Sequence, residues 1–261
     1  MVQAQGGPTV RLADEVIMPL VGFGTWSLRD EQAYTAVRTA LEVGYRHIDT
    51  ATMYGNEAAI GRALRDSEVD RSEVFVTTKL PPENVGQERR TIEQSLRDLN
   101  TDYVDLWLVH WPPEDAIVPT WQEFLAARDA GLAREVGVSN HSIAQIDELG
   151  RATGWVPAVN QVPWSPFQHD GLLLAEHRER GVFVEGYSPL KGSDLNDPVL
   201  GKVAERHRVT PAQVVLRWHL EHGIGVIPRS GDEKRIAANF DLFGFSLDED
   251  EVAAIDALAE R

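Results

Sequence analysis

Residues 74–109 of this chain read VFVTTKLPPENVGQERRTIEQSLRDLNTDYVDLWLV, and this stretch decides the fold. It begins and ends with runs rich in β-branched and aromatic residues, Val74–Thr78 and Val104–Val109, which predict two strands. Between the runs lie apolar residues at the spacing that places side chains on one face of a helix: Ile92, Leu96 and Leu99. Both strands are largely apolar on their two faces, as parallel strands covered by helices are. The stretch therefore predicts a strand–helix–strand unit with parallel strands.

The same alternation recurs along the whole chain. The candidate strands are Val21–Gly24, His47–Ile48, Val74–Thr78, Val104–Val109, Glu135–Val138, Ala158–Gln161, Phe183–Gly186 and Gly225–Ile227. Because amphipathic segments separate these strands, the pattern predicts an α/β protein, a (β/α)8 TIM barrel that forms a single domain over residues 1–261. An open, doubly wound sheet is the alternative fold.

Two segments lie outside this alternation. Thr9–Ile17 predicts a short N-terminal hairpin with Ala13-Asp14-Glu15 in its middle, placed to plug the floor of the barrel. Leu247–Leu258 predicts a C-terminal helix, because Ser246 is a plausible N-cap and acidic residues follow in the first turn.

The composition narrows the possible functions. The chain contains no cysteine, which excludes disulfides, thiolate zinc sites and a cysteine nucleophile, and we expect no metal site. Its formal net charge of −16 argues against a general nucleic-acid surface. No apolar run is long enough to span a membrane, and Met1–Pro8 lacks the pattern of a secretory signal. We therefore expect a cytoplasmic, monomeric protein that binds neither nucleic acid nor membrane.

Ionisable side chains follow three of the predicted strands, where a parallel barrel forms its active site. Asp49, Lys79 and His110 each end an apolar run, and Tyr54 lies five residues after Asp49. A lysine at the end of a buried strand needs a carboxylate partner, and Asp49 on the neighbouring strand is the natural one. A cation near the hydroxyl of Tyr54 favours the phenolate and lowers the tyrosine pKa, which improves Tyr54 as a proton donor.

His110 would then orient a carbonyl oxygen or share the proton, so the set suits the reduction of a carbonyl. Two other interpretations remain open on these residues alone. The pair of Asp49 and Lys79, together with His110, can be a structural element at the barrel end. Alternatively, Lys79 can serve as the nucleophile of a Schiff-base aldolase.

Beyond these four residues, the chain resembles the aldo-keto reductases nearly from end to end. The matching motifs around the four residues are Gly44–Ala51 with Tyr54–Glu57, Thr77–Leu80, and Val109–Pro112. The resemblance is strongest to the prokaryotic reductases that include 2,5-diketo-D-gluconate reductases. It implies that Tyr54 donates the proton, that Lys79 and Asp49 adjust the pKa of Tyr54, and that His110 positions the carbonyl. Hydride would come from the nicotinamide C4.

The resemblance also implies NADPH as the cofactor. No GxGxxG motif follows the first strand, so this binding would not be of the Rossmann kind. The implied cofactor residues are Thr25, Trp26, Ser139, Asn140, Gln161, Tyr187, Ser188, Pro189, Leu190, Gly192, Ile227, Pro228, Arg229, Ser230, Arg235 and Asn239. Arg229 stands where the family usually has lysine, and it would meet the adenosine 2′-phosphate together with Arg235.

For the substrate, the resemblance implies a small carbonyl compound. The implied pocket residues are Phe23, Trp26, Tyr54, His110 and Trp111, with core packing as the alternative for the aromatic rings. The predicted function is the NADPH-dependent reduction of aldehydes or ketones, dicarbonyls and keto-sugars among them, to alcohols. A cofactor-binding regulatory subunit on the same barrel is the alternative in another functional class.

Overall fold

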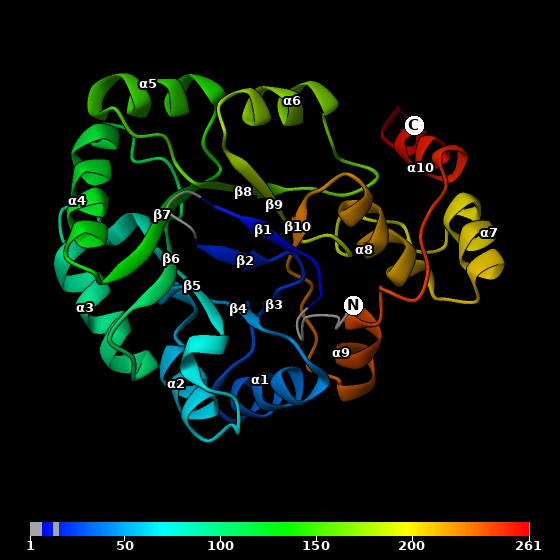
Figure 1. Ribbon diagram of the computed structural model, residues 1–261, viewed down its shortest axis with the longest axis horizontal. Helices are drawn as coiled ribbons and strands as arrows, with labels where there is room; N and C mark the ends of the chain where they lie inside the picture. The colour runs from blue at the N-terminus through cyan, green and yellow to red at the C-terminus, as the bar shows by residue number, and fades with distance from the viewer. Residues whose placement is uncertain (1–6, 13–15, 261) are drawn as a thin grey trace.

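The predicted strands form one parallel sheet whose order follows the chain (Figure 1). The computed structural model describes residues 7–12 and 16–260. The eight strands are β3 (Phe23–Gly24), β4 (His47–Asp49), β5 (Phe75–Leu80), β6 (Val104–Val109), β7 (Ala133–Ser139), β8 (Val159–Pro163), β9 (Phe183–Tyr187) and β10 (Gly225–Val226). Each differs from the predicted range by no more than a few residues at its ends.

The sheet closes on itself between its first and last strands. Val21 forms a parallel bridge with Val226, and the backbone N–H of Val226 donates to Leu20 at 2.8 Å. Gly24 permits the first strand to approach the residues after the last strand closely, because a Cβ at Gly24 would lie only 2.8 Å from the carbonyl oxygen of Ile227. The closed sheet confirms the predicted (β/α)8 barrel and excludes the open sheet.

Helices surround the sheet (Figure 1). They are α1 (Asp30–Val43), α2 (Glu57–Arg65), α3 (Glu88–Leu99), α4 (Ile117–Asp129), α5 (Ile143–Thr153), α6 (Gly171–Glu179), α7 (Pro198–His207), α8 (Pro211–Glu221), α9 (Glu233–Phe240) and α10 (Glu249–Asp256). Two of them, α7 and α10, lie outside this ring and pack against α8 (Figure 1). In α3, Ile92, Leu96 and Leu99 are buried, as their spacing predicts. In the part of the chain that the structure describes, no helix has the length and apolarity to cross a membrane.

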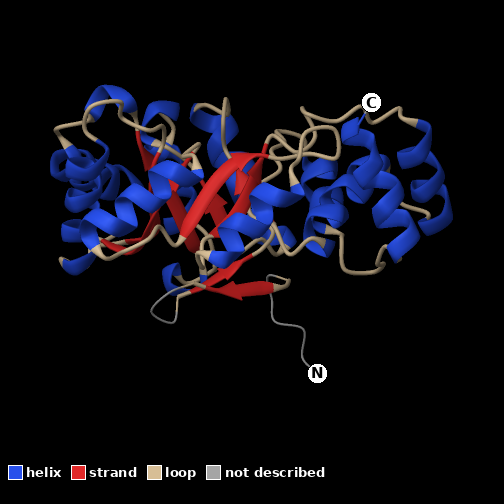
Figure 2. Ribbon diagram, turned by 90° about the horizontal axis from the view of Figure 1, so that it is seen from above, coloured by secondary structure: helices blue, strands red, loops and turns tan. Residues whose placement is uncertain are grey.

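The predicted N-terminal hairpin lies across one end of the barrel (Figure 2). Its strands β1 (Thr9–Arg11) and β2 (Ile17–Pro19) pair antiparallel, whereas residues 13–15 lie outside the described residues. Met18 is fully buried against barrel residues that include Leu106 and Leu108. The hairpin therefore plugs the barrel at the amino-terminal ends of the strands, opposite the predicted active site.

The predicted C-terminal helix is present as α10, but its N-cap differs from the prediction. Asp248, rather than Ser246, caps the helix: its side chain accepts from the N–H of Glu251 at 2.9 Å. The Glu251 side chain in turn accepts from the backbone N–H of Asp248 at 3.0 Å. This reciprocal capping box satisfies two backbone donors, which a serine two residues earlier does not reach.

Candidate active site

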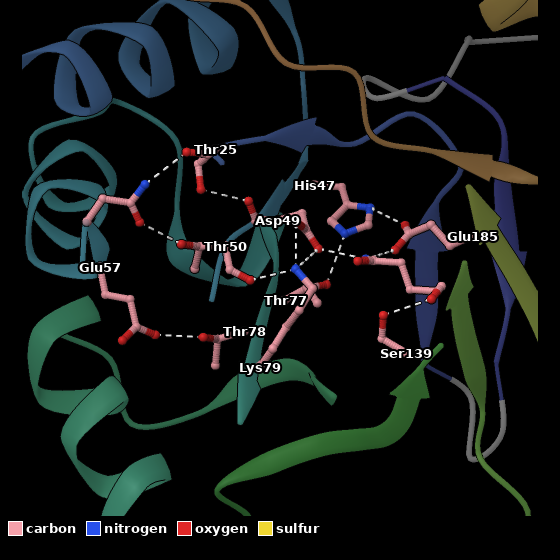
Figure 3. A network of polar contacts seen from close by, with 12 residues as sticks. Thr25, His47, Asp49, Thr50, Glu57, Thr77, Thr78, Lys79, Ser139 and Glu185 are labelled. Atoms are coloured by element: carbon pink, nitrogen blue, oxygen red, sulfur yellow. Dashed lines mark hydrogen bonds and ion pairs between the residues drawn. The ribbon is translucent and has the colours of Figure 1, made fainter. Parts of the chain in front are cut away.

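A buried ion pair joins the carboxyl ends of β4 and β5. Lys79 Nζ lies 2.7 Å from both carboxylate oxygens of Asp49 and 2.8 Å from the carbonyl oxygen of Thr50. Figure 3 shows the two side chains pointing toward each other, and both are almost fully buried. Burial is the largest influence on the pKa of Lys79 and lowers it, but Asp49, Tyr54 and Glu185 together outweigh burial, so the pKa is raised. Lys79 is therefore a cation whose N–H groups all have acceptors.

Tyr54 lies directly beside this pair, at the end of the short 3₁₀ turn Thr52–Tyr54. The Lys79 ammonium is 5.3 Å from the centroid of the Tyr54 ring. The ring of His110, which follows β6, is 5.8 Å from the Tyr54 ring and nearly perpendicular to it. The four residues predicted from three strand ends thus converge at one end of the barrel.

The pKa values distinguish the possible proton donors. Burial raises the pKa of Tyr54 above its ordinary value, and the ammonium of Lys79 opposes this rise. The net direction corrects the predicted lowering: Lys79 has the expected effect, but the loss of solvent around the phenol is larger. Burial, and then Lys79, lower the pKa of His110 to about 3. His110 is therefore a neutral imidazole near pH 7 and does not carry the additional proton of an imidazolium ion.

A cavity of about 580 Å³ opens above Tyr54 and His110. Its outer wall consists of three apolar side chains that are unusually exposed for their size, Trp26 (56 %), Met53 (44 %) and Trp111 (46 %). The Trp26 ring packs edge-on against Tyr54 with centroids 5.0 Å apart. The phenol is therefore reached through an apolar, aromatic entrance.

Amide and hydroxyl groups line the opposite wall of the cavity. Asn140 donates to the carbonyl oxygen of His110 at 3.1 Å and accepts from the hydroxyl of Tyr187 at 2.9 Å. Ser139 donates to the carbonyl oxygen of Gln161 at 2.8 Å. Asn140 and Ser188 both have positive φ angles, 61° and 54°, which are uncommon for residues other than glycine. This wall fits a nicotinamide, because it offers amides for a carboxamide and the Tyr187 ring for stacking.

Cations lie in the lining of the same cavity and next to it. Ile227, Pro228 and Arg229 line it, and the Arg229 side chain is exposed. Arg235, also exposed, donates from Nε to the hydroxyl of the buried Ser230 at 3.4 Å. This part of the site fits a phosphate group, which two guanidinium groups and a hydroxyl can hold.

Most of the predicted cofactor residues line the cavity, and a smaller group lies elsewhere. The residues that line it are Trp26, Ser139, Asn140, Gln161, Tyr187, Ser188, Pro189, Leu190, Ile227, Pro228 and Arg229. Those outside the lining are Thr25, Gly192, Ser230, Arg235 and Asn239. Thr25 is fully buried and donates to the carbonyl oxygen of Asp49 at 2.9 Å, so it supports a strand end.

Phe23 does not line the cavity, which corrects the predicted substrate wall. Its side chain is 1 % exposed and packs edge-on against Tyr45, with ring centroids 5.5 Å apart. Phe23 is therefore a core residue, which is the alternative interpretation of the aromatic rings.

Sequence reasoning missed three residues that line the cavity: Gly24, Met53 and Lys191. Each is adjacent in sequence to a residue that was singled out, namely Thr25, Tyr54 and Leu190. Extending each predicted motif by one residue would have found all three.

Comparison with known proteins gives concordant matches. Residues 20–260 match the model of the aldo/keto reductase family. A methylglyoxal reductase, DkgA, from Yersinia pestis is 40% identical over 96% of this chain and 92% of its own length. A crystal structure of an aldo/keto reductase from Brucella melitensis superposes with a TM-score of 0.94 at 40% identity, covering 99% of each chain.

A structural relative shows the cofactor directly. The aldo-keto reductase of Bombyx mori, solved in complex with NADP, superposes with a TM-score of 0.90 at 34% identity over 98% of this chain and 94% of its own. The family match confirms the predicted class of oxidoreductase, an aldo-keto reductase, and the Bombyx mori relative binds the dinucleotide predicted for this chain. Because the family model and relatives at 40% identity both cover nearly all of its length, this chain belongs to the aldo/keto reductase family.

Proposed function

We propose that this protein reduces small aldehydes and ketones to alcohols, with Tyr54 as the proton donor. The observation that carries the proposal is the buried ion pair of Lys79 and Asp49 directly behind Tyr54, at the base of a cavity whose far wall suits NADPH. When bound, NADPH supplies the hydride that reduces the carbonyl carbon.

Each side chain has a separate role in this proposal. Tyr54 gives its proton to the carbonyl oxygen, and the Lys79 ammonium stabilises the phenolate that remains. His110 is neutral because its pKa is about 3, so it orients the carbonyl oxygen with a hydrogen bond instead of protonating it. Asp49 holds Lys79 in place and balances its charge.

The aldolase alternative receives no support from the position of Lys79. Its side chain is fully buried, donates to three oxygens and is not among the residues that line the cavity. A Schiff-base lysine must instead present a free lone pair to its substrate.

The entrance favours uncharged carbonyl compounds. Trp26, Met53 and Trp111 form its outer wall, whereas the cations that line the cavity, Lys191 and Arg229, adjoin in sequence the residues proposed for the cofactor, Leu190 and Pro228. The similarity to a methylglyoxal reductase supports small dicarbonyls as one such class. A place in the 2,5-diketo-D-gluconate subgroup stays a prediction.

The test compares Tyr54→Phe with the wild type in NADPH oxidation assays with methylglyoxal and a panel of neutral aldehydes. We expect kcat to fall roughly 10²-fold or more, the scale of general acid catalysis, with NADPH affinity nearly unchanged. Tyr34→Phe is the matched control, because Tyr34 is a surface tyrosine on α1. Near wild-type kcat in Tyr54→Phe would remove Tyr54 from the mechanism, and no carbonyl reduction by the wild type would refute the function.

A further inference from the structure

A second carboxyl group lies inside the barrel behind the proposed cofactor site. Glu185 on β9 stands directly opposite Gln161 on β8 in the sheet register. Its side chain is fully buried, and it does not line the cavity. Figure 3 shows it beside His47.

Glu185 is only half satisfied, which is costly for a buried carboxyl group. One of its oxygens, Oε2, accepts from Gln161 at 2.7 Å, while the other has no hydrogen-bond partner among the described residues. His47 Nδ1 lies 3.8 Å from that second oxygen but donates to the carbonyl oxygen of Pro19 at 3.1 Å. Burial lowers the pKa of His47 to about 4, so no ion pair forms near neutral pH. A buried polar atom without a partner in a folded protein calls for a functional explanation.

The contact of the other oxygen, Oε2, with Gln161 indicates what Glu185 does. Gln161 Nε2 carries two hydrogens, and it donates to Asp49 at 2.8 Å and to Glu185 at 2.7 Å. Both hydrogens are therefore used inside the barrel, and the orientation of the amide follows from its two carboxylate acceptors. The Oε1 atom accepts no hydrogen bond from the described residues, and Gln161 lines the cavity.

We propose that Glu185 is a positioning residue for cofactor binding: it locks the Gln161 amide so that its oxygen faces the nicotinamide carboxamide. With Asp49 as its only acceptor, the amide could turn about a single hydrogen bond. The second acceptor fixes its plane. An amide oxygen fixed in this way accepts from the N–H₂ group of a carboxamide.

The charges around Glu185 agree with this role. Burial, and then the Asp49 carboxylate, raise the pKa of Glu185 to about 8, so it is largely neutral at pH 7. A neutral Glu185 accepts from Gln161 without adding a second negative charge beside the pair of Asp49 and Lys79. The titratable groups near it are Asp49, Lys79 and His47.

This inference rests on the proposed placement of the nicotinamide, and its test measures binding instead of catalysis. Calorimetric titrations compare NADPH with adenosine 2′,5′-bisphosphate, which has no nicotinamide. Glu185→Leu removes the acceptor, and we expect it to weaken NADPH roughly 5-fold, the effect of one hydrogen bond. Adenosine 2′,5′-bisphosphate should bind as it does to the wild type.

Glu185→Gln is the conservative variant, because its amide oxygen can still accept from Gln161, and it should restore NADPH affinity. The loss caused by Glu185→Leu should also vanish in a Gln161→Leu background. Glu185→Met serves in its place if the leucine variant does not fold. Unchanged NADPH affinity, equal losses for both ligands, or a glutamine variant as weak as the leucine variant would each overturn the inference. Failure of the wild type to bind NADPH would instead refute the proposed function.

Discussion

The two ends of the cavity are built in different ways. At the Tyr54 end, Lys79, Asp49 and Gln161 are buried and form a continuous set of short hydrogen bonds. At the other end, Arg229 and Arg235 are exposed, and the Arg235 side chain donates one long hydrogen bond, to Ser230 at 3.4 Å, among the described residues. The chemistry proposed for Tyr54 is thus held by the core of the barrel, whereas the cations proposed for the phosphate depend on the ligand to order them.

This difference predicts that breaking the buried ion pair behind Tyr54 mainly costs stability, and that a substitution at the phosphate end mainly costs affinity. The largest effect is expected for Asp49→Asn, which leaves the Lys79 ammonium buried without its carboxylate. Breaking a buried pair in this way costs about 3–5 kcal/mol of unfolding free energy. Urea denaturation measures this cost.

Two variants sharpen this comparison. Glu93→Gln breaks the exposed pair of Arg89 and Glu93, whose atoms are 2.6 Å apart, and should leave the free energy of unfolding almost unchanged. The double variant Asp49→Asn/Lys79→Met removes the unpaired charge and should recover part of the lost stability. Equal, small losses for Asp49→Asn and Glu93→Gln would contradict a special role for burial.

The next effect is a pH dependence of stability that Glu185 creates. Its pKa rises from 4.5 to about 8 on folding, so the folded state holds this proton more tightly than the unfolded state. The resulting stabilisation is complete below about pH 4.5 and is lost as the pH rises through 8. Between about pH 5 and pH 8, the wild type should lose roughly 3–4 kcal/mol more stability than Glu185→Gln, since one unit of pKa corresponds to about 1.4 kcal/mol. Parallel curves in thermal denaturation would show that Glu185 does not titrate in this range.

The smallest effect is expected at the phosphate end. Arg235→Ala should weaken NADPH about ten-fold, because one charge-assisted contact is worth about 1.5 kcal/mol or more, and should leave NADH binding and the melting temperature unchanged. Lys234→Ala is the matched control, since Lys234 is an exposed cation next to Arg235, and only Arg235 of the two donates a side-chain hydrogen bond to Ser230 among the described residues. Equal losses of NADPH and NADH in a fluorescence titration would mean that Arg235 does not recognise the 2′-phosphate.

The sequence by itself determined the barrel and the position of the four residues around Tyr54. Strand runs such as Val104–Val109 are largely apolar on both faces, which is typical of buried parallel strands, and their alternation with amphipathic segments indicated the fold. Asp49, Lys79 and His110 each end one of these strands, and the carboxyl ends of parallel strands meet at one end of a barrel. Their convergence therefore followed from local pattern alone.

Only the tertiary structure decided what depends on the surroundings of a side chain in three dimensions. The side of the sheet that Phe23 faces, and the net direction of the Tyr54 pKa, depend on how much solvent the packed neighbours remove. The contact between Glu185 and Gln161 depends on the register of β8 and β9. Neighbouring residues in sequence do not specify that register, because hydrogen bonds between strands join backbone atoms that every residue type except proline possesses.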